Sequence, residues 1–366
     1  PGLFYNHEPL DFAKPEARKG MQEALDAIKA KGATSVPAVV SGKSLSTAET
    51  VARVNPSNTS ETVANVSYAS AEQTHQAIES AKAAQGRWAK TPVTERANML
   101  DKAADIMAER RFELAATEII EVGKTWAEAD GDIIEAIDFC RFYAKEMRKL
   151  DQPFRTGHAP GELSLYQYSA VGVAAVIAPW NFPLAILAGM TTSCLVTGNT
   201  VLMKPAEQSS LIAYRLYEIL RQAGVPSDAL HFLPGRGEIV GETLTSHPDV
   251  DIVSFTGSQD VGLKILNKAS TFQPGQSRIK KAVLELGGKN AVIIDSDADL
   301  DEAVDGVVYS AFGFQGQKCS ACSRAIVLEG IYDRFVNRLI EATKSLHVGE
   351  SNRPETYVGP VVDQEA

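Results

Sequence analysis

The sequence has 366 residues, of which 44% are hydrophobic, and its formal net charge is −10 at neutral pH. This length exceeds one ordinary hydrophobic core, so we expect two domains. The acidic balance disfavours nucleic acid and an anionic membrane surface as partners, because either requires a basic patch. An apolar run from Ala170 to Ala178 is too short for a bilayer, which takes about 20 residues to span. We therefore expect a small-molecule partner or another copy of the chain.

The first half of the chain has mainly helical patterning. Pro15–Lys31 is predicted to be a helix, and VPAVVSGKSLS after it an extended surface segment. Three amphipathic runs, Ala71–Lys90, Val93–Val122 and Trp126–Lys149, predict a helical layer. Phe154 to Tyr168 contains GHAPGE between alternating residues, which predicts a projecting β-hairpin that pairs with another subunit.

From Val171 the pattern changes to short apolar runs, each followed by a helix-like run. The runs are VGVAAVIAP, TVLMKP, ALHFLP, DIVSFTGS and KAVLELG. Such alternation is typical of βαβ units in a parallel sheet and predicts an α/β fold. AVIID and SRAIVLE, each followed by a helix-like run, predict a second α/β unit that begins near Gly287.

The chain has four cysteines, Cys140, Cys194, Cys319 and Cys322. Four are too few for a disulfide framework in a chain of this length, and no secretory feature is seen, so we expect the reducing cytoplasm. Cys319 and Cys322 form a C-x-x-C pair. No second pair or histidine spacing completes a zinc site, so no metal is predicted.

Cys319 follows the glycine-bearing loop GFQGQK. In such a loop, free backbone amides can stabilise a thiolate, and a thiolate attacks an aldehyde carbonyl. The alternative is a small buried hydrophobic residue, the usual role of a free cysteine. Cys322 lacks the preceding glycines and is predicted to be a packing residue.

Two other residues fit the same chemistry. Glu285 lies in the strand-like run KAVLELGG, where a carboxylate in apolar surroundings is costly unless it has a task such as activating water. Its alternative is a buried salt bridge. Asn181 lies in PWNFP, where two prolines restrict the backbone and could aim its amide at an oxyanion. Its alternative is a turn asparagine that binds its own backbone.

Two strand ends are predicted to hold a dinucleotide. In FTGSQDVG, Gly257 and Ser258 lie between a strand and a helix, where free amides favour a pyrophosphate. In TVLMKPAEQS, Lys204 and Glu207 follow a strand, and Glu207 could accept both ribose hydroxyls and repel a 2′-phosphate. The alternative is a solvated charge pair. LPGRGEIVG is off by one residue from the dinucleotide fingerprint and is predicted to be a capped turn.

With these motifs, residues 50 to 366 resemble the aldehyde dehydrogenase superfamily. The segments that carry the resemblance are PWNFP, FTGS, LELGGK and GQKCSA. FYNHEPLDFAKPEARKGMQEAL, EAIDF at Glu135–Phe139 and GFQGQKCSACSR at Gly313–Arg324 resemble the pyrroline-5-carboxylate dehydrogenases in particular. Those enzymes oxidise glutamate semialdehyde to glutamate. The resemblance implies two Rossmann-type α/β domains with a projecting β-hairpin arm for oligomerisation.

The resemblance also implies a role for each candidate residue. Cys319 is the implied nucleophile, Glu285 the general base, and Asn181 with the Cys319 amide the oxyanion hole. The implied NAD contacts are Pro179, Trp180, Lys204, Glu207, Gly257 and Ser258. The implied substrate contacts are Glu135, Phe182, Lys318 and Ser320. A homodimer or higher homo-oligomer, coupled or fused to a proline dehydrogenase, is also implied.

We predict three regions. Residues 1–153 and 172–286 form a helical layer and NAD-binding domain, 154–171 the oligomerisation hairpin, and 287–366 an incomplete catalytic domain. A fragment is expected, because relatives continue with a glutamate for the nicotinamide ribose, a loop for the substrate α-carboxylate and a last strand. The alternatives are a dehydrogenase for another semialdehyde or aliphatic aldehyde, a cysteine hydrolase, which needs a histidine beside Cys319, and a non-catalytic homologue.

Overall fold

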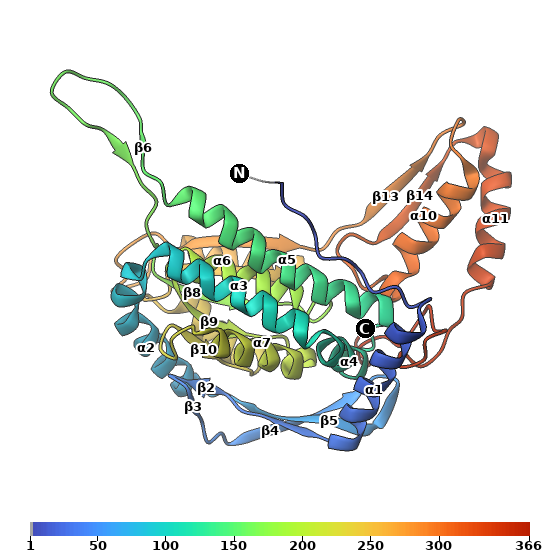
Figure 1. Cartoon of the computed structure of the whole chain (residues 1–366), viewed down its shortest axis with the longest axis horizontal. Helices are drawn as coiled ribbons and strands as arrows, with labels where there is room; N and C mark the ends of the chain where they lie inside the picture. The colour runs from blue at the N-terminus through green and yellow to red at the C-terminus, as the bar shows by residue number, and fades with distance from the viewer. Residues whose placement is uncertain (1–2) are drawn as a thin grey trace.

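The computed structural model of the protein describes residues 3–366, and its centre is a seven-stranded sheet (Figure 1). The strand order is β12-β11-β8-β9-β10-β2-β3. The first five strands in this order are parallel, and β2 and β3 join them antiparallel. Their bounds are β2 Val39–Val40, β3 Lys43–Ser44, β8 Val173–Ile177, β9 Thr200–Lys204, β10 Leu230–Phe232, β11 Ile252–Gly257 and β12 Lys281–Leu286. The predicted α/β fold is confirmed.

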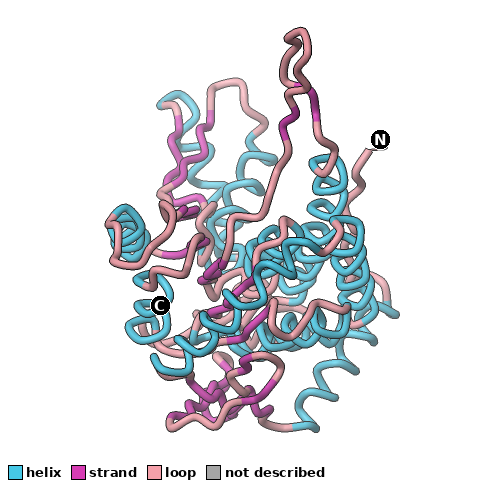
Figure 2. The backbone as a smooth tube through the Cα atoms, turned by 90° about the vertical axis from the view of Figure 1, so that its left-hand side faces the viewer, coloured by secondary structure: helices cyan, strands magenta, loops and turns pink. Residues whose placement is uncertain are grey.

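Helices cover both faces of this sheet, which Figure 2 shows from the side. Successive strand residues point to opposite faces, so Ala174 and Val176 of β8 pack in one core while Val173 and Ala175 pack in the other. The first core is completed mainly by α1 Pro15–Lys31, α3 Val93–Glu109, α4 Arg111–Val122, α5 Trp126–Leu150, α6 Ala185–Val196 and α7 Ser210–Ala223. The second is completed mainly by α2 Ala71–Lys90, α8 Glu242–Ser246 and α9 Gln259–Ser270.

Two features of the N-terminal part differ from the sequence prediction. The run 93–122 is two helices, because Arg110 leaves the helical conformation at φ −96° and ψ 16° and its guanidinium binds Glu113 in the first turn of α4. A three-stranded sheet was also missed. It has the order β1-β5-β4, with bounds β1 Thr34–Val36, β4 Glu49–Asn55 and β5 Asn58–Tyr68.

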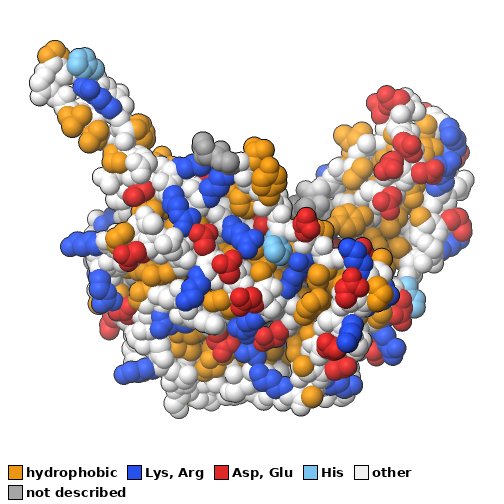
Figure 3. Space-filling model, in the orientation of Figure 1, with side chains coloured by type: hydrophobic (Ala, Val, Ile, Leu, Met, Phe, Trp, Pro, Cys, Tyr) orange, Lys and Arg blue, Asp and Glu red, His pale blue; other side chains and the backbone are white. Residues whose placement is uncertain are grey.

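A hairpin and a second α/β unit project from the body (Figure 1). The hairpin contains β6 Phe154–Arg155 and β7 Leu165–Tyr166, which pair antiparallel. Its apolar side chains are exposed, and Figure 3 shows them along the arm. The second unit contains the parallel strands β13 and β14 with two helices and a core of its own. Its bounds are β13 Asn290–Ile294, α10 Leu300–Phe312, β14 Cys322–Val327 and α11 Tyr332–Lys344.

The segment after α11 returns to the main body. The Ser351 hydroxyl donates to the Ile119 carbonyl at 3.0 Å, and the Arg53 guanidinium donates to the Val362 carbonyl at 3.1 Å. These bonds anchor the second unit beside the helical layer, next to the edge at which the parallel strands end.

Candidate active site

The carboxyl ends of four parallel strands meet at one edge of the sheet. Ile177 of β8 is in register with Lys204 of β9 and Phe255 of β11, and Thr256 is in register with Glu285 of β12. Ligands of open α/β sheets bind outside this edge. The sheet therefore brings together the segments in which Asn181, Lys204, Gly257 and Glu285 were predicted to act.

A strained turn precedes the candidate nucleophile. In Gly313–Gly316, Phe314 and Gln315 have φ of 44° and 57°. Such a conformation costs about 1–3 kcal/mol per residue and persists only where the surroundings hold it. Phe314 is buried edge-on to Trp180, with ring centroids 6.4 Å apart, and the Gln315 amide donates to the Pro360 carbonyl at 2.6 Å. Two of the three described non-glycine residues with positive φ therefore lie four and five residues before Cys319.

Of the four cysteines in the chain, Cys319 is the one that is exposed. Its carbonyl accepts a hydrogen bond from the Asn290 amide at 2.7 Å, and a Cβ on Gly288 would lie 3.4 Å from that oxygen, so the loop contacts the turn after β12. Cys140 and Cys194 are buried, and burial raises the pKa of each thiol to about 12. A reactive thiolate needs access and a low pKa, so these two are unsuited to catalysis.

Asn181 lies beside this loop. Its Nδ2 donates to the carbonyl of Gln317 at 3.0 Å, and its Oδ1 accepts from the backbone N–H of Phe182 at 3.1 Å. The local backbone bond considered as the alternative is thus present together with a bond to the Cys319 loop. An amide has two N–H donors, so one remains for a ligand oxygen.

The expectation that Glu285 lies in apolar surroundings is wrong. β12 is the edge strand of the sheet, and the face that carries Lys281, Val283 and Glu285 is exposed. The free-energy cost of burying the Glu285 carboxylate, from which its role was predicted, is therefore absent in this structure. The position of Glu285 supports its predicted role instead, since it lies three residues before Gly288, which touches the Cys319 loop.

The four residues predicted to contact substrate line one cavity of about 360 Å³. They are Glu135, Phe182, Lys318 and Ser320. The Lys318 ammonium forms an ion pair with Glu128 at 2.6 Å and lies 5.3 Å from the centre of the Tyr309 ring. Glu128, Asp132 and Tyr309 also line this cavity and were missed, although Glu128, Asp132 and Glu135 recur on α5 at near-helical spacing.

The cavity is suited to a ligand with charges of both signs. Lys318 supplies an ammonium, while Glu128 and Glu135 supply carboxylates. Burial, and then the neighbouring Asp132, raise the pKa of Glu135. The Lys318–Glu128 ion pair packs against Gly313. A Cβ added at Gly313 would lie 2.9 Å from Glu128 Oε1 and 3.1 Å from Lys318 Nζ, so a side chain at this position would displace the pair.

The predicted cofactor residues do not line this cavity. Lys204 is buried, and burial lowers the pKa of its ammonium to about 8. Its Nζ donates to the Pro205 carbonyl at 3.1 Å, which leaves further N–H donors for a ligand. Glu207 accepts a hydrogen bond from the Gly237 N–H at 3.1 Å, and Ser258 caps α9 by accepting from Val261 at 3.4 Å.

The remaining cofactor candidates follow β8 or end β11. Pro179 and Trp180 are partly buried directly after β8. A Cβ on Gly257 would lie 2.5 Å from the Phe255 ring, so a residue without a side chain is needed there.

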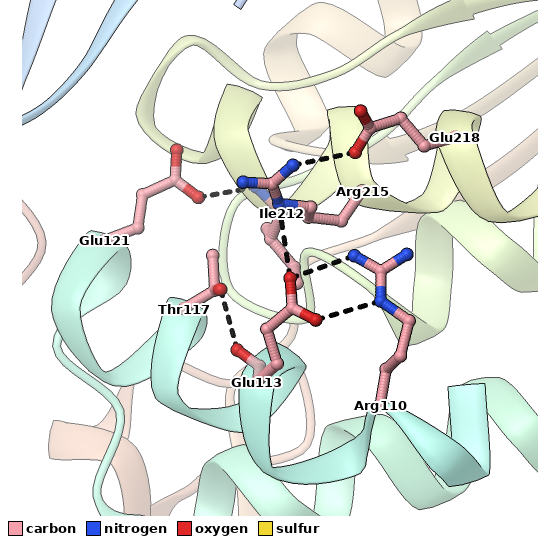
Figure 4. Close-up of polar contacts among 7 residues, drawn as sticks. All are labelled: Arg110, Glu113, Thr117, Glu121, Ile212, Arg215 and Glu218. Carbon is pink, nitrogen blue, oxygen red and sulfur yellow. Dashed lines mark hydrogen bonds and ion pairs between the residues drawn. The ribbon is translucent and has the colours of Figure 1, made fainter. Parts of the chain in front are cut away.

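A buried carboxylate fixes the helix that follows Glu207. Glu121 at the end of α4 accepts hydrogen bonds from the backbone N–H groups of Leu211 and Ile212 at 2.7 and 2.9 Å, and Figure 4 shows it pointing at the first turn of α7. In the same view, Glu113 binds both Arg110 and Arg215. Burial raises the pKa of Glu121 to about 7. These contacts hold α7, and with it the Lys204–Glu207 segment.

A second, larger cavity is lined by none of the predicted site residues. It has a volume of about 960 Å³ and lies at the base of the hairpin, between the ends of α5 and α6 and strand β12. Within residues 3–366, no group of three or more His, Cys, Asp and Glu side chains is placed to hold a metal ion. No helix in the same range is both long and apolar enough to cross a membrane.

Known proteins resemble this chain over almost its whole length. Residues 43–366 match the model of the aldehyde dehydrogenase family. The chain belongs to this family. It is 44% identical over 363 residues to 1-pyrroline-5-carboxylate dehydrogenase of Geobacillus sp. (strain WCH70) and 41% identical over 361 residues to that of Bacillus subtilis. These matches cover 99% and 98% of this chain and 70% of each relative.

Two solved structures superimpose over the whole chain. Proline utilization A of Bdellovibrio bacteriovorus, inactivated by N-propargylglycine, gives a TM-score of 0.98 at 54% identity, and 38% of that protein is covered. The 1-pyrroline-5-carboxylate dehydrogenase of Thermus, with bound NAD, gives 0.97 at 41% identity, and 71% of it is covered. The predicted resemblance to the pyrroline-5-carboxylate dehydrogenases is therefore confirmed.

Proposed function

We propose that this aldehyde dehydrogenase oxidises L-glutamate 5-semialdehyde, formed from 1-pyrroline-5-carboxylate, to L-glutamate with NAD, the second step of proline catabolism. One observation carries the proposal. The loop that holds the exposed Cys319 is bonded to Asn181, and the adjoining Lys318 reaches into a cavity that also holds Glu128 and Glu135. A substrate with an aldehyde at one end and an amino-acid head at the other suits this arrangement. The names of the relatives support the same substrate.

Catalysis begins with a new bond between the Cys319 sulfur and the aldehyde carbon. The carbonyl oxygen becomes an oxyanion, and the free N–H of Asn181 together with a backbone amide stabilises it, at about 3–4 kcal/mol for one such donor. The Lys318 ammonium and the pocket carboxylates orient the amino-acid head, which converts binding energy into alignment of the reacting atoms.

The residues at the ends of β9 and β11 fit a dinucleotide. Lys204 has N–H donors that remain free for a ligand, and Glu207 can accept hydrogen bonds from ribose hydroxyls. Ser258 caps the twelve-residue helix α9, whose first backbone amides are available for a pyrophosphate. When bound, NAD supplies the acceptor for the hydride of the aldehyde carbon. Glu285 then takes a proton from water, which attacks the thioester carbon and releases the carboxylic acid and the Cys319 thiolate.

The charges in the cavity separate this proposal from oxidation of a different aldehyde. If Lys318 recognises a carboxylate, an aliphatic aldehyde of the same chain length without the α-amino and α-carboxyl groups is a poor substrate. We propose NAD rather than NADP because the Glu207 carboxylate repels a 2′-phosphate.

The direct test is NADH formation by the intact protein with glutamate semialdehyde, compared with the matched aliphatic aldehyde. We expect turnover with the semialdehyde, and no turnover by Cys319→Ala although NAD still binds. Cys322→Ala is the matched control, because Cys322 opens β14 as a packing residue and its loss leaves turnover intact. Oxidation by Cys319→Ala, or equal kcat/KM for the two aldehydes, contradicts the proposal.

The surroundings of the chain are part of the proposal. The exposed apolar residues of the hairpin support pairing with a second copy in a homodimer or larger homo-oligomer. The likeness to proline utilization A supports coupling or fusion to a proline dehydrogenase. Four free cysteines support a cytoplasmic location. We also propose the division into an NAD-binding domain, a hairpin and a catalytic domain. The main core, the projecting hairpin and the separate core of the second α/β unit support it.

A further inference from the structure

Three charged side chains are almost fully buried next to the candidate site, and none of the steps above assigns a role to Glu118 or Lys124. Glu118 and Lys124 are 0% exposed and Asp132 is 1% exposed. The Lys124 ammonium lies 3.5 Å from Glu118 Oε2 and 3.5 Å from Asp132 Oδ2. Both Glu118 oxygens, Lys124 Nζ and Asp132 Oδ1 have no hydrogen-bond partner within residues 3–366. Buried ions are costly and seldom add net stability, so these three residues, the Lys124 cluster, call for another explanation.

The charges of the Lys124 cluster balance if one carboxyl group keeps its proton. Burial, followed by the neighbouring Asp132, raises the pKa of Glu118 well above its usual value. Asp132 accepts a hydrogen bond from the Leu184 N–H at 3.1 Å. Of the two carboxyl groups, Glu118 is therefore the one expected to keep its proton.

The Lys124 ammonium also faces two aromatic rings from the two halves of the candidate site. It lies 4.6 Å from the centre of the Phe182 ring and 5.2 Å from that of Phe314, within the range of cation–π attraction. Phe182 directly follows Asn181, and Phe314 starts the left-handed turn before Cys319. We propose that Lys124 is a positioning residue, which ties these two segments together and so fixes Asn181 relative to Cys319.

Two further observations agree with this role. Asp132, the partner of Lys124, bonds the backbone at Leu184 and so holds the other end of the segment that carries Asn181. Phe314 has a conformation that is unfavourable for a bulky side chain, and it needs contacts that hold it in place. The cation supplies such a contact from inside the protein, whereas Trp180 supplies one from the site.

The inference rests on the proposed roles of Asn181 and Cys319, and kinetics of the intact protein test it. Lys124→Met is expected to lower kcat on the order of 10²-fold, which is the effect of a small misalignment of the reacting groups. The kcat is expressed per protein molecule whose Cys319 thiol reacts with a thiol reagent. The KM for NAD is expected to stay unchanged, because Lys124 faces Phe182 and Phe314 and not the ends of β9 and β11, where the cofactor is proposed to bind. Lys149→Met at the exposed end of α5 is the matched control and is expected to keep the wild-type kcat.

A double-mutant cycle separates positioning from general damage. If Lys124 acts through Asn181, the variant with both Lys124→Met and Asn181→Ala loses no more kcat than Asn181→Ala alone. Losses that multiply, or a wild-type kcat in Lys124→Met, overturn the inference. If Lys124→Met does not fold because Asp132 is left unpaired, Lys124→Met with Asp132→Asn removes both charges and undergoes the same test.

Hydrogen exchange decides the inference without any turnover. Lys124→Met is expected to speed backbone exchange in both 181–184 and 313–319, and Lys149→Met in neither. Unchanged exchange, or faster exchange in one segment alone, overturns the positioning role. A wild-type protein that oxidises no aldehyde refutes the proposed function, while the exchange result still decides the role of Lys124.

Discussion

Replacing Lys204 with methionine should stabilise the protein while weakening its binding of NAD. Methionine has a similar length and no charge. Lys204 is only 4% exposed, and burial lowers the pKa of its ammonium from 10.5 to about 8. One pKa unit corresponds to about 1.4 kcal/mol, so folding with a charged Lys204 costs about 3 kcal/mol at pH 7. The substitution removes this cost, but it also removes the hydrogen bond to the Pro205 carbonyl, which offsets about 1 kcal/mol of the increase in stability.

The sign of the pH dependence follows from the lowered pKa. The unfolded chain binds the Lys204 proton more tightly, so the cost is fully present below pH 8 and disappears as the pH rises to 10.5. By pH 9.5 it has fallen to less than about half of its value at pH 7. Urea unfolding of wild type and Lys204→Met at pH 7 and pH 9.5 measures the difference, and NAD titration measures binding. A variant that is less stable than wild type at pH 7, or a stability difference independent of pH, refutes this reasoning.

Three other substitutions test separate parts of the site. Glu207→Gln removes the charge that repels a 2′-phosphate, so the ratio of kcat/KM for NAD to that for NADP should fall at least about tenfold; an unchanged ratio removes Glu207 from cofactor selection. Gly313→Ala should displace the Lys318–Glu128 pair and raise the KM for glutamate semialdehyde about tenfold, a loss of about 1.4 kcal/mol, with the KM for NAD as the internal control. Gln315→Ala should lower the free energy of unfolding by about 1–3 kcal/mol, since the Pro360 carbonyl loses its donor and the Gly359 N–H its acceptor; equal urea midpoints contradict this.

The parts of the site that were predictable are those coded by local sequence. PWNFP fixes the backbone around Asn181, and the glycine-bearing loop does the same before Cys319. Segments that follow parallel strands meet at the carboxyl ends of those strands, so their proximity can be predicted without knowing the strand order. The βαβ alternation likewise predicts the sheet, because each apolar run is short and is followed by a helix.

Two of the features that were missed depend on contacts between distant segments. The exposure of Glu285 follows from β12 being an edge strand, and a strand order cannot be read from one apolar run. Glu118 and Asp132 look like polar positions of amphipathic helices, and only the packing of α4 against α5 buries them around Lys124. The hairpin of β4 and β5 was available locally, since alternating residues flank the turn at Asn55–Asn58.

The most direct test of the account is to trap the covalent intermediate on the intact protein. Glu285→Gln should slow the attack of water by about 10² to 10⁴, so rapid acid quenching in the presence of NAD and glutamate semialdehyde should capture a glutamyl thioester. We expect peptide mass spectrometry to find this mass on the peptide of Cys319 at the sulfur of that residue. A glutamyl group on Cys322, or NADH formation with no acylated cysteine at any time point, contradicts the account.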